Sequence, residues 1–265
     1  MNDSNKYSPG EFGYWWTVTM KRKDIEGLDY EGDINISYMG ISSLRGAPRS
    51  VTGDFLSYGN SLSTLKHCPI EIGKDFLFSS NDITSLEHCP ESVGGNFWCG
   101  SNKITSLKGC PQHIHGNFWI ENNKLTNLEH APSRVDGSFR CSLNFLTSLK
   151  GCPSKIVGDV HCYNNRLTSL EYSPEEVTGD FYCQQNCLTD LAHAPSKVSG
   201  DFNCALNNIS DPLSEIINRD IEAKRYLTVE GKAITFEELA IEKQRRANIK
   251  RQLGPFAITA PGSKI

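Results

Sequence analysis

The sequence predicts an elongated solenoid in which short repeats stack on one parallel, curved β-sheet. Three observations predict it, and the first is an asparagine every 21 residues, at Asn60, Asn81, Asn102, Asn123, Asn144, Asn165, Asn186 and Asn207. Met39 takes the same position one period earlier, which makes about nine repeats. The second and third observations are apolar residues and a proline at fixed distances from each asparagine. A period of this length is typical of proteins whose repeats bury their apolar faces only by stacking.

Each repeat is predicted to contain a short strand just before its asparagine. Apolar residues stand five positions before it, at Phe55, Phe76, Phe97, Phe118, Phe139, Val160, Phe181 and Phe202. A second series, three positions before it, comprises Ser57, Phe78, Cys99, Ile120, Cys141, Cys162, Cys183 and Cys204. Residues two apart share one face of a strand, so both series are predicted to face the core. Leucine or isoleucine two residues after the asparagine, and leucine five after it, continue the apolar interior.

The remainder of each repeat is predicted to be turn or extended chain. An aliphatic residue stands nine positions before the asparagine, and a glycine follows two residues later in every repeat but that of Lys74. We interpret this glycine as a bend leading into the strand. The proline nine residues after the asparagine, from Pro48 to Pro195, disfavours a full helix on the outer side.

The repeat pattern F-x-C-x-x-N-x-L resembles the leucine-rich repeat family over residues 28 to about 212. One departure is that the first aliphatic residue lies nine rather than eight positions before the asparagine. The resemblance implies an asparagine ladder that binds backbone groups of adjacent repeats, and a concave sheet face that binds partners. The short unit with its proline is similar to the bacterial and bacteriophage branch of that family.

The two ends are predicted to cap the stack. Residues 1–27, with Trp15 and Trp16, form an N-terminal cap, and residues 28–212 form the solenoid. Residues 213–265 form an α/β cap with a helix from Pro212, two short strands, and a helix opened by a capping box of Thr235 and Glu238. Phe236, Leu239 and Ala240 are expected to pack. The basic segment 243–251 is interpreted as a solvated face or as a patch for an acidic partner, and the tail as flexible.

Composition narrows the class of protein. The net charge is −4, no apolar run approaches 18 residues, and the first residues lack a signal-peptide core, so we expect a cytoplasmic protein. Nine of the ten cysteines occupy repeat positions where other repeats have phenylalanine, isoleucine or alanine. We therefore predict reduced thiols that fill the core, with Cys187 alone outside these positions.

No catalytic, cofactor or metal motif is recognised. Phosphate loops, nucleophile elbows and dinucleotide glycine patterns are absent from the sequence. The pairs His67-Cys68 and His88-Cys89 stack on successive repeats, but neighbouring side chains point in opposite directions, which argues against four metal ligands. We therefore predict a non-enzymatic protein without cofactor or metal.

The candidate binding surface is the sheet face opposite the core. Residues four and two positions before each asparagine point outward if the apolar series point inward. Tryptophan, tyrosine and arginine are enriched in interface hot spots. The predicted partner-binding residues are Leu77, Trp98, Trp119, Glu121, Arg140, His161, Tyr163 and Tyr182. A further row six before the asparagine, rich in aspartate and asparagine, either supports the backbone or forms an acidic stripe.

The predicted function is binding of another protein. The resemblance suggests a bacteriophage or bacterial factor that inhibits or redirects a host protein, such as a defence component. Two alternatives remain. One is an enzyme or enzyme subunit with its site in the C-terminal cap. The other is a nucleic-acid-binding protein that stacks bases on Trp98, Trp119, Tyr182 and Arg140. The aspartate-rich row and the net charge argue against nucleic-acid binding.

Overall fold

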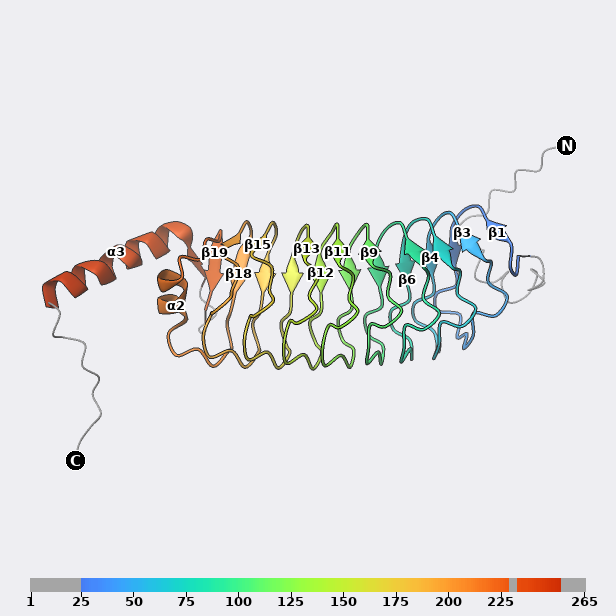
Figure 1. The fold of residues 1–265 in the computed structure, drawn as a ribbon, viewed down its shortest axis with the longest axis horizontal. Helices are drawn as coiled ribbons and strands as arrows, with labels where there is room; N and C mark the ends of the chain where they lie inside the picture. The colour runs from blue at the N-terminus through green and yellow to red at the C-terminus, as the bar shows by residue number, and fades with distance from the viewer. Residues whose placement is uncertain (1–24, 229–232, 254–265) are drawn as a thin grey trace, which may run out of the picture.

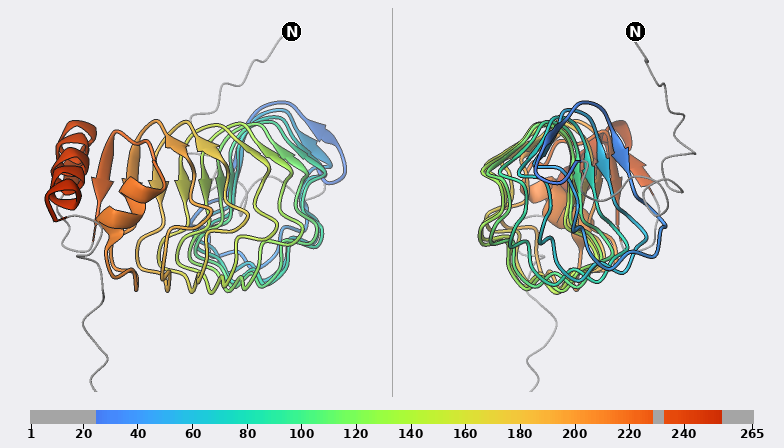
Figure 2. Two further views of the ribbon diagram at one scale, coloured as in Figure 1. Left: turned by 60° about the vertical axis from the view of Figure 1, so that its left-hand side comes forward. Right: turned by 90° about the vertical axis from the view of Figure 1, so that its right-hand side faces the viewer.

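The structure, a computed structural model, describes residues 25–228 and 233–253. It is a solenoid of about nine coils, each of 21 residues, with β1 (Asp29–Tyr30) and α3 (Phe236–Leu253) at opposite ends (Figure 1). In the near end-on view of Figure 2, successive coils overlay as loops around a common interior and are progressively offset along the chain. The predicted repeat solenoid is confirmed. Trp15 and Trp16 of the expected N-terminal cap, and the tail beyond Leu253, lie outside the described residues.

One continuous sheet runs along the stack, as predicted. Its nine repeat strands pair in parallel with a shift of one period, so that Phe97 is opposite Phe118 and Phe118 opposite Phe139. These strands are β2 (Ile34–Asn35), β4 (Phe55–Leu56), β6 (Phe76–Leu77), β8 (Phe97–Trp98), β10 (Phe118–Trp119), β12 (Phe139–Arg140), β14 (Val160–His161), β16 (Phe181–Tyr182) and β18 (Asp201–Asn203).

A second series of two-residue strands was not predicted. It forms at the aliphatic position nine before the asparagine, where Val93, Ile114 and Val135 are buried and β-branched residues favour extended backbone. These strands pair in groups of four, three and two. After β1 they are β3 (Ser50–Val51), β5 (Glu71–Ile72), β7 (Ser92–Val93), β9 (His113–Ile114), β11 (Arg134–Val135), β13 (Lys155–Ile156), β15 (Glu176–Val177) and β17 (Lys197–Val198).

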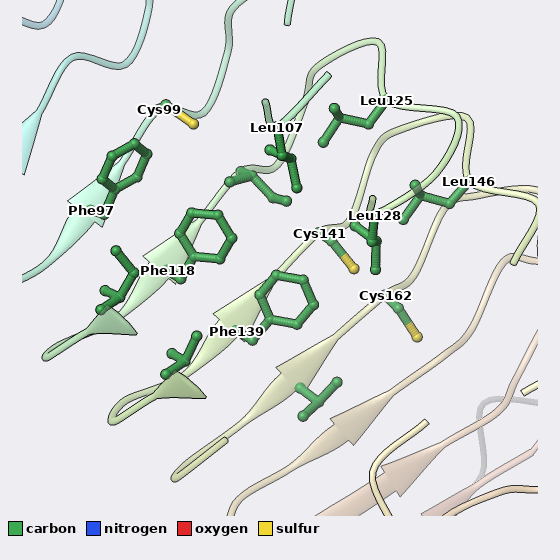
Figure 3. Close-up of a cluster of buried hydrophobic side chains, with 14 of the residues drawn as sticks. Phe97, Cys99, Leu107, Phe118, Leu125, Leu128, Phe139, Cys141, Leu146 and Cys162 are labelled. Carbon is green, nitrogen blue, oxygen red and sulfur yellow. The ribbon is translucent and has the colours of Figure 1, made fainter. Parts of the chain in front are cut away.

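The core is a set of columns in which equivalent residues of successive coils touch (Figure 3). The rings of Phe97 and Phe118 have centroids 5.5 Å apart, and those of Phe118 and Phe139 lie 5.6 Å apart and nearly parallel. Cys99 and Leu107 point into the same interior and are buried. The predicted inward assignment of both apolar series before the asparagine is confirmed by this burial.

All ten cysteines are free thiols in the structure. Burial raises the pKa of the nine that occupy repeat positions, for example Cys141 and Cys183, and raises that of Cys152 to about 12. Cys187 is the exposed one. The interpretation of the repeat cysteines as small apolar core residues agrees with this environment.

The asparagines form a hydrogen-bonded ladder. The Asn102 side-chain amide donates to the carbonyls of Phe78 and Cys99, each at 3.0 Å, and its oxygen accepts from the backbone N–H of Ile83 at 3.0 Å. The same pattern repeats from Asn81 to Asn207. Each asparagine therefore satisfies buried backbone groups of its own coil and of the preceding one.

The aspartate-rich row forms a second ladder rather than a free acidic stripe. The side-chain oxygen of Asp75 accepts from the backbone N–H of Asn96 at 2.8 Å, and Asn96 does the same for Asn117. This confirms the backbone-supporting interpretation. It also explains the glycines, because a Cβ on Gly95 would lie 2.2 Å from the Asp75 side chain. The glycines make room for this ladder, whereas we expected them to provide a bend.

Two positions in every coil have left-handed backbone. One immediately precedes the asparagine, as at Ser101 and Asn122, and the other lies seven residues after it, where histidine or glycine stands in most coils and Tyr172 in one. His67 and His88 occupy the second turn with φ of 70° and 65° and are exposed, as predicted. This turn position tolerates several residue types, which accounts for the histidines that recur there, His67, His88, His130 and His193.

The C-terminal segment first adds to the end of the stack and then projects away from it as helix α3. Helix α2 (Pro212–Asn218) is capped by Asp211, whose side chain accepts from the Ser214 N–H at 3.0 Å. Strand β19 (Arg225–Leu227) pairs in parallel with β18, and β20 (Ala233–Thr235) pairs antiparallel with β19. Tyr226 is opposite Phe202 and fully buried, so it continues the phenylalanine column as a tenth layer.

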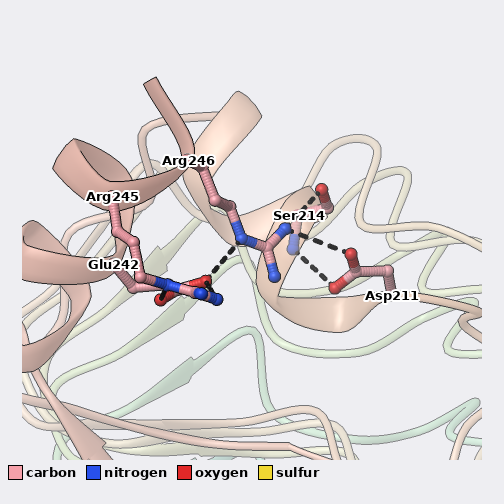
Figure 4. Close-up of polar contacts among 5 residues, drawn as sticks. All are labelled: Asp211, Ser214, Glu242, Arg245 and Arg246. Atoms are coloured by element: carbon pink, nitrogen blue, oxygen red, sulfur yellow. Dashed lines mark hydrogen bonds and ion pairs between the residues drawn. The ribbon is translucent and has the colours of Figure 1, made fainter. Parts of the chain in front are cut away.

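Helix α3 projects from the end of the stack (Figure 1), and its Arg246 side chain donates to Asp211 and to Ser214 of α2 (Figure 4). The expected capping box is present, since the Thr235 hydroxyl accepts from the Glu238 N–H and the Glu238 carboxylate from the Thr235 N–H. The expected packing was wrong in part. Leu239 is buried, but Phe236 and Ala240 are exposed because the helix leaves the stack after its first turn.

Candidate functional site

The in-register sheet brings six of the predicted residues into one line. Trp98 is paired with Leu77 on one side and with Trp119 on the other, and the line continues through Arg140, His161 and Tyr182. In each strand the first residue is buried and the second is half-buried. We call Leu77, Trp98, Trp119, Arg140, His161 and Tyr182 the aromatic row.

The side chains of the aromatic row pack on one another. The rings of Trp98 and Trp119 meet edge to face with centroids 5.1 Å apart, and the Arg140 guanidinium carbon lies 4.7 Å from the Trp119 ring centre. His161 stacks on Tyr182 at 4.6 Å with an angle of 9° between the planes. We expected the two tryptophans to be exposed. They are half-buried, because each is covered by its neighbours along the row.

Glu121 belongs to the neighbouring outward row and is bonded to the first tryptophan. The Trp98 indole N–H donates to Glu121 Oε1 at 3.0 Å. Burial raises the pKa of the Glu121 carboxyl, and the hydrogen bonds and the Arg140 charge oppose this only in part. Gly100 makes the contact possible, since a Cβ there would lie 2.8 Å from the Trp98 indole nitrogen and 3.1 Å from Glu121. Sequence reasoning placed Gly100 in this row without a role.

The remaining predicted residues, His161, Tyr163 and Tyr182, carry polar groups on their rings, and partial burial shifts the pKa of two of them. Burial, followed by the Arg140 charge, lowers the pKa of His161, so its imidazole is favoured in the neutral form. Burial, followed by Asp180, raises the pKa of Tyr182 to about 12. Tyr163 lies beside the row with its ring centroid 6.0 Å from that of His161. All eight predicted residues therefore lie on one continuous stretch of the sheet.

Five polar atoms on this stretch are shielded from solvent and make no hydrogen bond to the described part of the chain. They are Trp119 Nε1, Glu121 Oε2, Arg140 Nε, His161 Nε2 and Gln184 Oε1. Only two further side-chain atoms in residues 25–228 and 233–253 share this property, on Ser37 and Ser57. Buried polar atoms normally have partners, so their concentration here marks the surface as unusual. Gln184 was not among the predicted site residues.

A second group of chemically capable side chains lies elsewhere and was missed by sequence reasoning. Within residues 25–228 and 233–253, the potential metal ligands that come together are His113, His115 and Asp136. The signal in the sequence was two histidines two residues apart, followed one period later by an aspartate. The histidine-cysteine pairs that we weighed instead have exposed histidines and half-buried cysteines.

Comparison with known proteins gives no family assignment: neither the protein-family models nor the curated proteins produced a match. Among the described helices, none combines the length and the apolar character that a membrane span requires.

Proposed function

We propose that this chain is a non-enzymatic, protein-binding scaffold that contacts its partner through the aromatic row. A repeat solenoid suits such a role, because stacked coils present an extended surface. The observation that supports the proposal most strongly is the run of packed rings from Trp98 to Tyr182 with unbonded polar atoms among them.

The energetic reason is preorganisation. Trp98 and Trp119 are held edge to face on paired strands, so they lose little conformational freedom when a partner covers them. The indole N–H of Trp119 and the Nε–H of Arg140 are donors without an acceptor in the described chain. A partner that inserts an acceptor beside them after a small side-chain rearrangement removes an unfavourable state of the free protein.

Two finer proposals rest on the resemblance of the repeat. The buried leucine columns and the asparagine ladder support assignment to the leucine-rich repeats, with the aromatic row on the concave face. The short repeat with its proline supports a bacterial or bacteriophage factor that acts in the cytoplasm on a host protein, for example to inhibit a defence component.

The proposal is tested by comparing Trp119→Ala with Phe145→Ala. Phe145 is an exposed ring that contacts Arg166 and lies outside the aromatic row, so it controls for general loss of an aromatic surface. A partner is first captured from host lysate with the unaltered chain, and its affinity for each purified, folded variant is then measured by calorimetry. We expect Trp119→Ala to weaken binding by about 2 kcal/mol and Phe145→Ala to leave it unchanged. Equal affinities of both variants would overturn the proposal.

A further inference from the structure

Three side chains from two adjacent coils converge on the second strand series. His113 belongs to β9 and His115 follows it, while Asp136 follows β11 on the next coil. The parallel pairing of Arg134 with His113 sets this register. One ligand atom of each residue lies within 4.8 Å of those of the other two.

The same carboxylate oxygen faces both imidazoles. Asp136 Oδ2 lies 2.7 Å from His113 Nε2 and 3.9 Å from His115 Nδ1, and the two imidazole centroids are 3.9 Å apart. In a tetrahedral zinc site with bonds of about 2.0–2.1 Å, neighbouring ligand atoms are about 3.4 Å apart. The two separations from Asp136 Oδ2 lie on either side of that value, and the three ligand atoms all lie within 4.8 Å of one another, so shifts of side chains would be sufficient to bring them to coordinating distance.

Arg134 contacts the group in a manner compatible with a bound ion. Its Nε donates to the other carboxylate oxygen, Oδ1, at 2.6 Å. This bond holds the carboxylate with Oδ2 toward the histidines, as outer hydrogen bonds commonly do for metal ligands. The competing description is an ion pair of Arg134 and Asp136 with one bonded histidine. That description accounts for His113, which is hydrogen-bonded to Asp136, but gives no reason for the position of His115, whose Nδ1 is 3.9 Å from the carboxylate.

Other coils do not need these residues. The positions equivalent to His113 are filled by Asp29, Ser50, Glu71, Ser92, Arg134, Lys155, Glu176 and Lys197. Those equivalent to His115 and Asp136 are filled by Glu31, Thr52, Gly73, Gly94, Val157, Thr178 and Ser199. The repeat therefore folds with almost any residue at these places, and the convergence of two imidazoles and a carboxylate is not a requirement of the solenoid.

We propose that His113, His115 and Asp136 bind a divalent transition-metal ion of the Zn²⁺ class across two coils. Imidazole with one carboxylate suits Zn²⁺, Co²⁺ or Ni²⁺ better than Mg²⁺ or Ca²⁺. The side chains are 37%, 54% and 22% exposed, so an ion reaches them from solvent and keeps coordination positions for water or an external ligand. The site lies on a different strand series from the aromatic row, and the proposal does not depend on the proposed function.

The test is titration of the full chain with Co²⁺ alone, in a Cys187→Ser background that removes the exposed thiol. The visible absorption of bound Co²⁺ reports binding, and Zn²⁺ is then added as a competitor. We expect one equivalent of Co²⁺ to bind and Zn²⁺ to displace it. His115→Ala should weaken binding at least tenfold, and Asp136→Asn should do the same.

The matched control is His88→Ala, which removes an exposed histidine that is not part of the group. His115→Ala preserves the His113–Asp136–Arg134 bonds and should fold normally, so the test remains decisive if Asp136→Asn is unstable. Binding that is absent, that is equal in His115→Ala and the parent, or that His88→Ala weakens as strongly would overturn the proposal. Sulfur-to-metal charge-transfer absorption would also overturn it, because it would place the ion on a cysteine.

Discussion

At the scale of single residues, polar side chains set the register between coils more strictly than apolar ones. The buried position three before the asparagine accepts phenylalanine, cysteine or isoleucine, as at Phe78, Cys99 and Ile120. Exchanges among these three residue types alter volume and leave no polar group unpaired. Ser57, at the same position, is the exception, since its buried hydroxyl makes no hydrogen bond to the described part of the chain. Asn102 cannot be exchanged in this way, because it satisfies two carbonyls and one N–H that are buried with it.

Glu121 gives a residue-scale prediction about pH. Burial raises the pKa of its carboxyl above the ordinary value of 4.5, so the folded state holds this proton more tightly than the unfolded state. Stability from this group is therefore fully present below pH 4.5 and is lost as pH rises through the raised pKa. We expect Glu121→Gln, which keeps an acceptor for Trp98, to unfold with a flatter pH dependence above pH 4.5 than the parent chain.

The measurement is chemical denaturation of both proteins between pH 4.5 and 7. Asp82→Asn serves as the control, since Asp82 pairs with Lys103 at the protein surface and lies outside the outward rows. If the parent and Glu121→Gln have the same pH slope, the carboxyl titrates alike in both states and its burial is not maintained in solution.

At the scale of secondary-structure elements, the sequence predicted whatever repeated and missed what occurred once or was too short to show a pattern. The β8–β10–β12 sheet and its inward residues follow directly from the 21-residue period. The two-residue strands of the second series have no alternation to detect. The two short strands expected in the C-terminal cap are present as β19 and β20, but the parallel pairing of β19 with β18 was not predicted, because Tyr226 follows Phe202 by 24 residues and so lies outside the period. The site residues were predictable as a row, whereas their half-burial depends on contacts between coils.

The basic residues of helix α3 differ in what they contact: Arg246 bonds to the start of α2, whereas Arg245 bonds only within its own helix among the described contacts. The sequence predicts either a solvated face or a partner-binding patch for the basic segment 243–251, and neither describes Arg246. Its guanidinium donates to Glu242 at 2.8 Å, to Asp211 at 3.1 Å and to the Ser214 hydroxyl at 2.9 Å (Figure 4). Arg245 contacts Glu242 of its own helix, and the two arginines lower the pKa of that carboxyl to about 2.

The element-scale prediction compares Arg246→Gln with Arg245→Gln. Both changes remove one cation beside Glu242, but only Arg246 links α3 to the cap of α2. The side chains are 34% and 65% exposed, so we expect Arg246→Gln to cost about 1 kcal/mol of stability and Arg245→Gln to cost clearly less. Hydrogen exchange of the α3 amides measures this, and equal protection in the two variants would show that Arg246 does not hold the helix in place.

At the scale of the whole molecule, the solenoid is a one-dimensional stack in which each coil contacts only its neighbours. Both polar ladders and the apolar columns are built from contacts between equivalent positions. The aromatic row arises from the same stacking, because paired strands bring single residues of different coils together. The 21-residue period therefore determines the fold, whereas a binding site depends on which residues adjacent coils place at their outward positions.

This view predicts that one whole coil can be removed without loss of the fold. A chain lacking residues 103–123 places Asn102 directly before Lys124, so that Phe97 and Trp98 meet Phe139 and Arg140. In the full chain the Asn144 side-chain amide donates to the carbonyl of Ile120, and in the shortened chain it would donate to the carbonyl of Cys99 instead. We expect the shortened chain to be folded and to melt in one transition, with stability lower by roughly a few kcal/mol because one interface between coils is lost.

Deleting residues 103–112 provides the comparison, since it removes fewer residues but breaks the 21-residue period. That chain cannot align Asn123 with the ladder, and we expect it to aggregate or to unfold without a cooperative transition. Circular dichroism melts and size-exclusion chromatography distinguish the two outcomes. The chain lacking residues 103–123 also lacks Trp119 and Glu121, so it should keep its fold while losing the partner. If it instead unfolds like the shorter deletion, the coils are not interchangeable units, and the register of the stack depends on contacts beyond neighbouring coils.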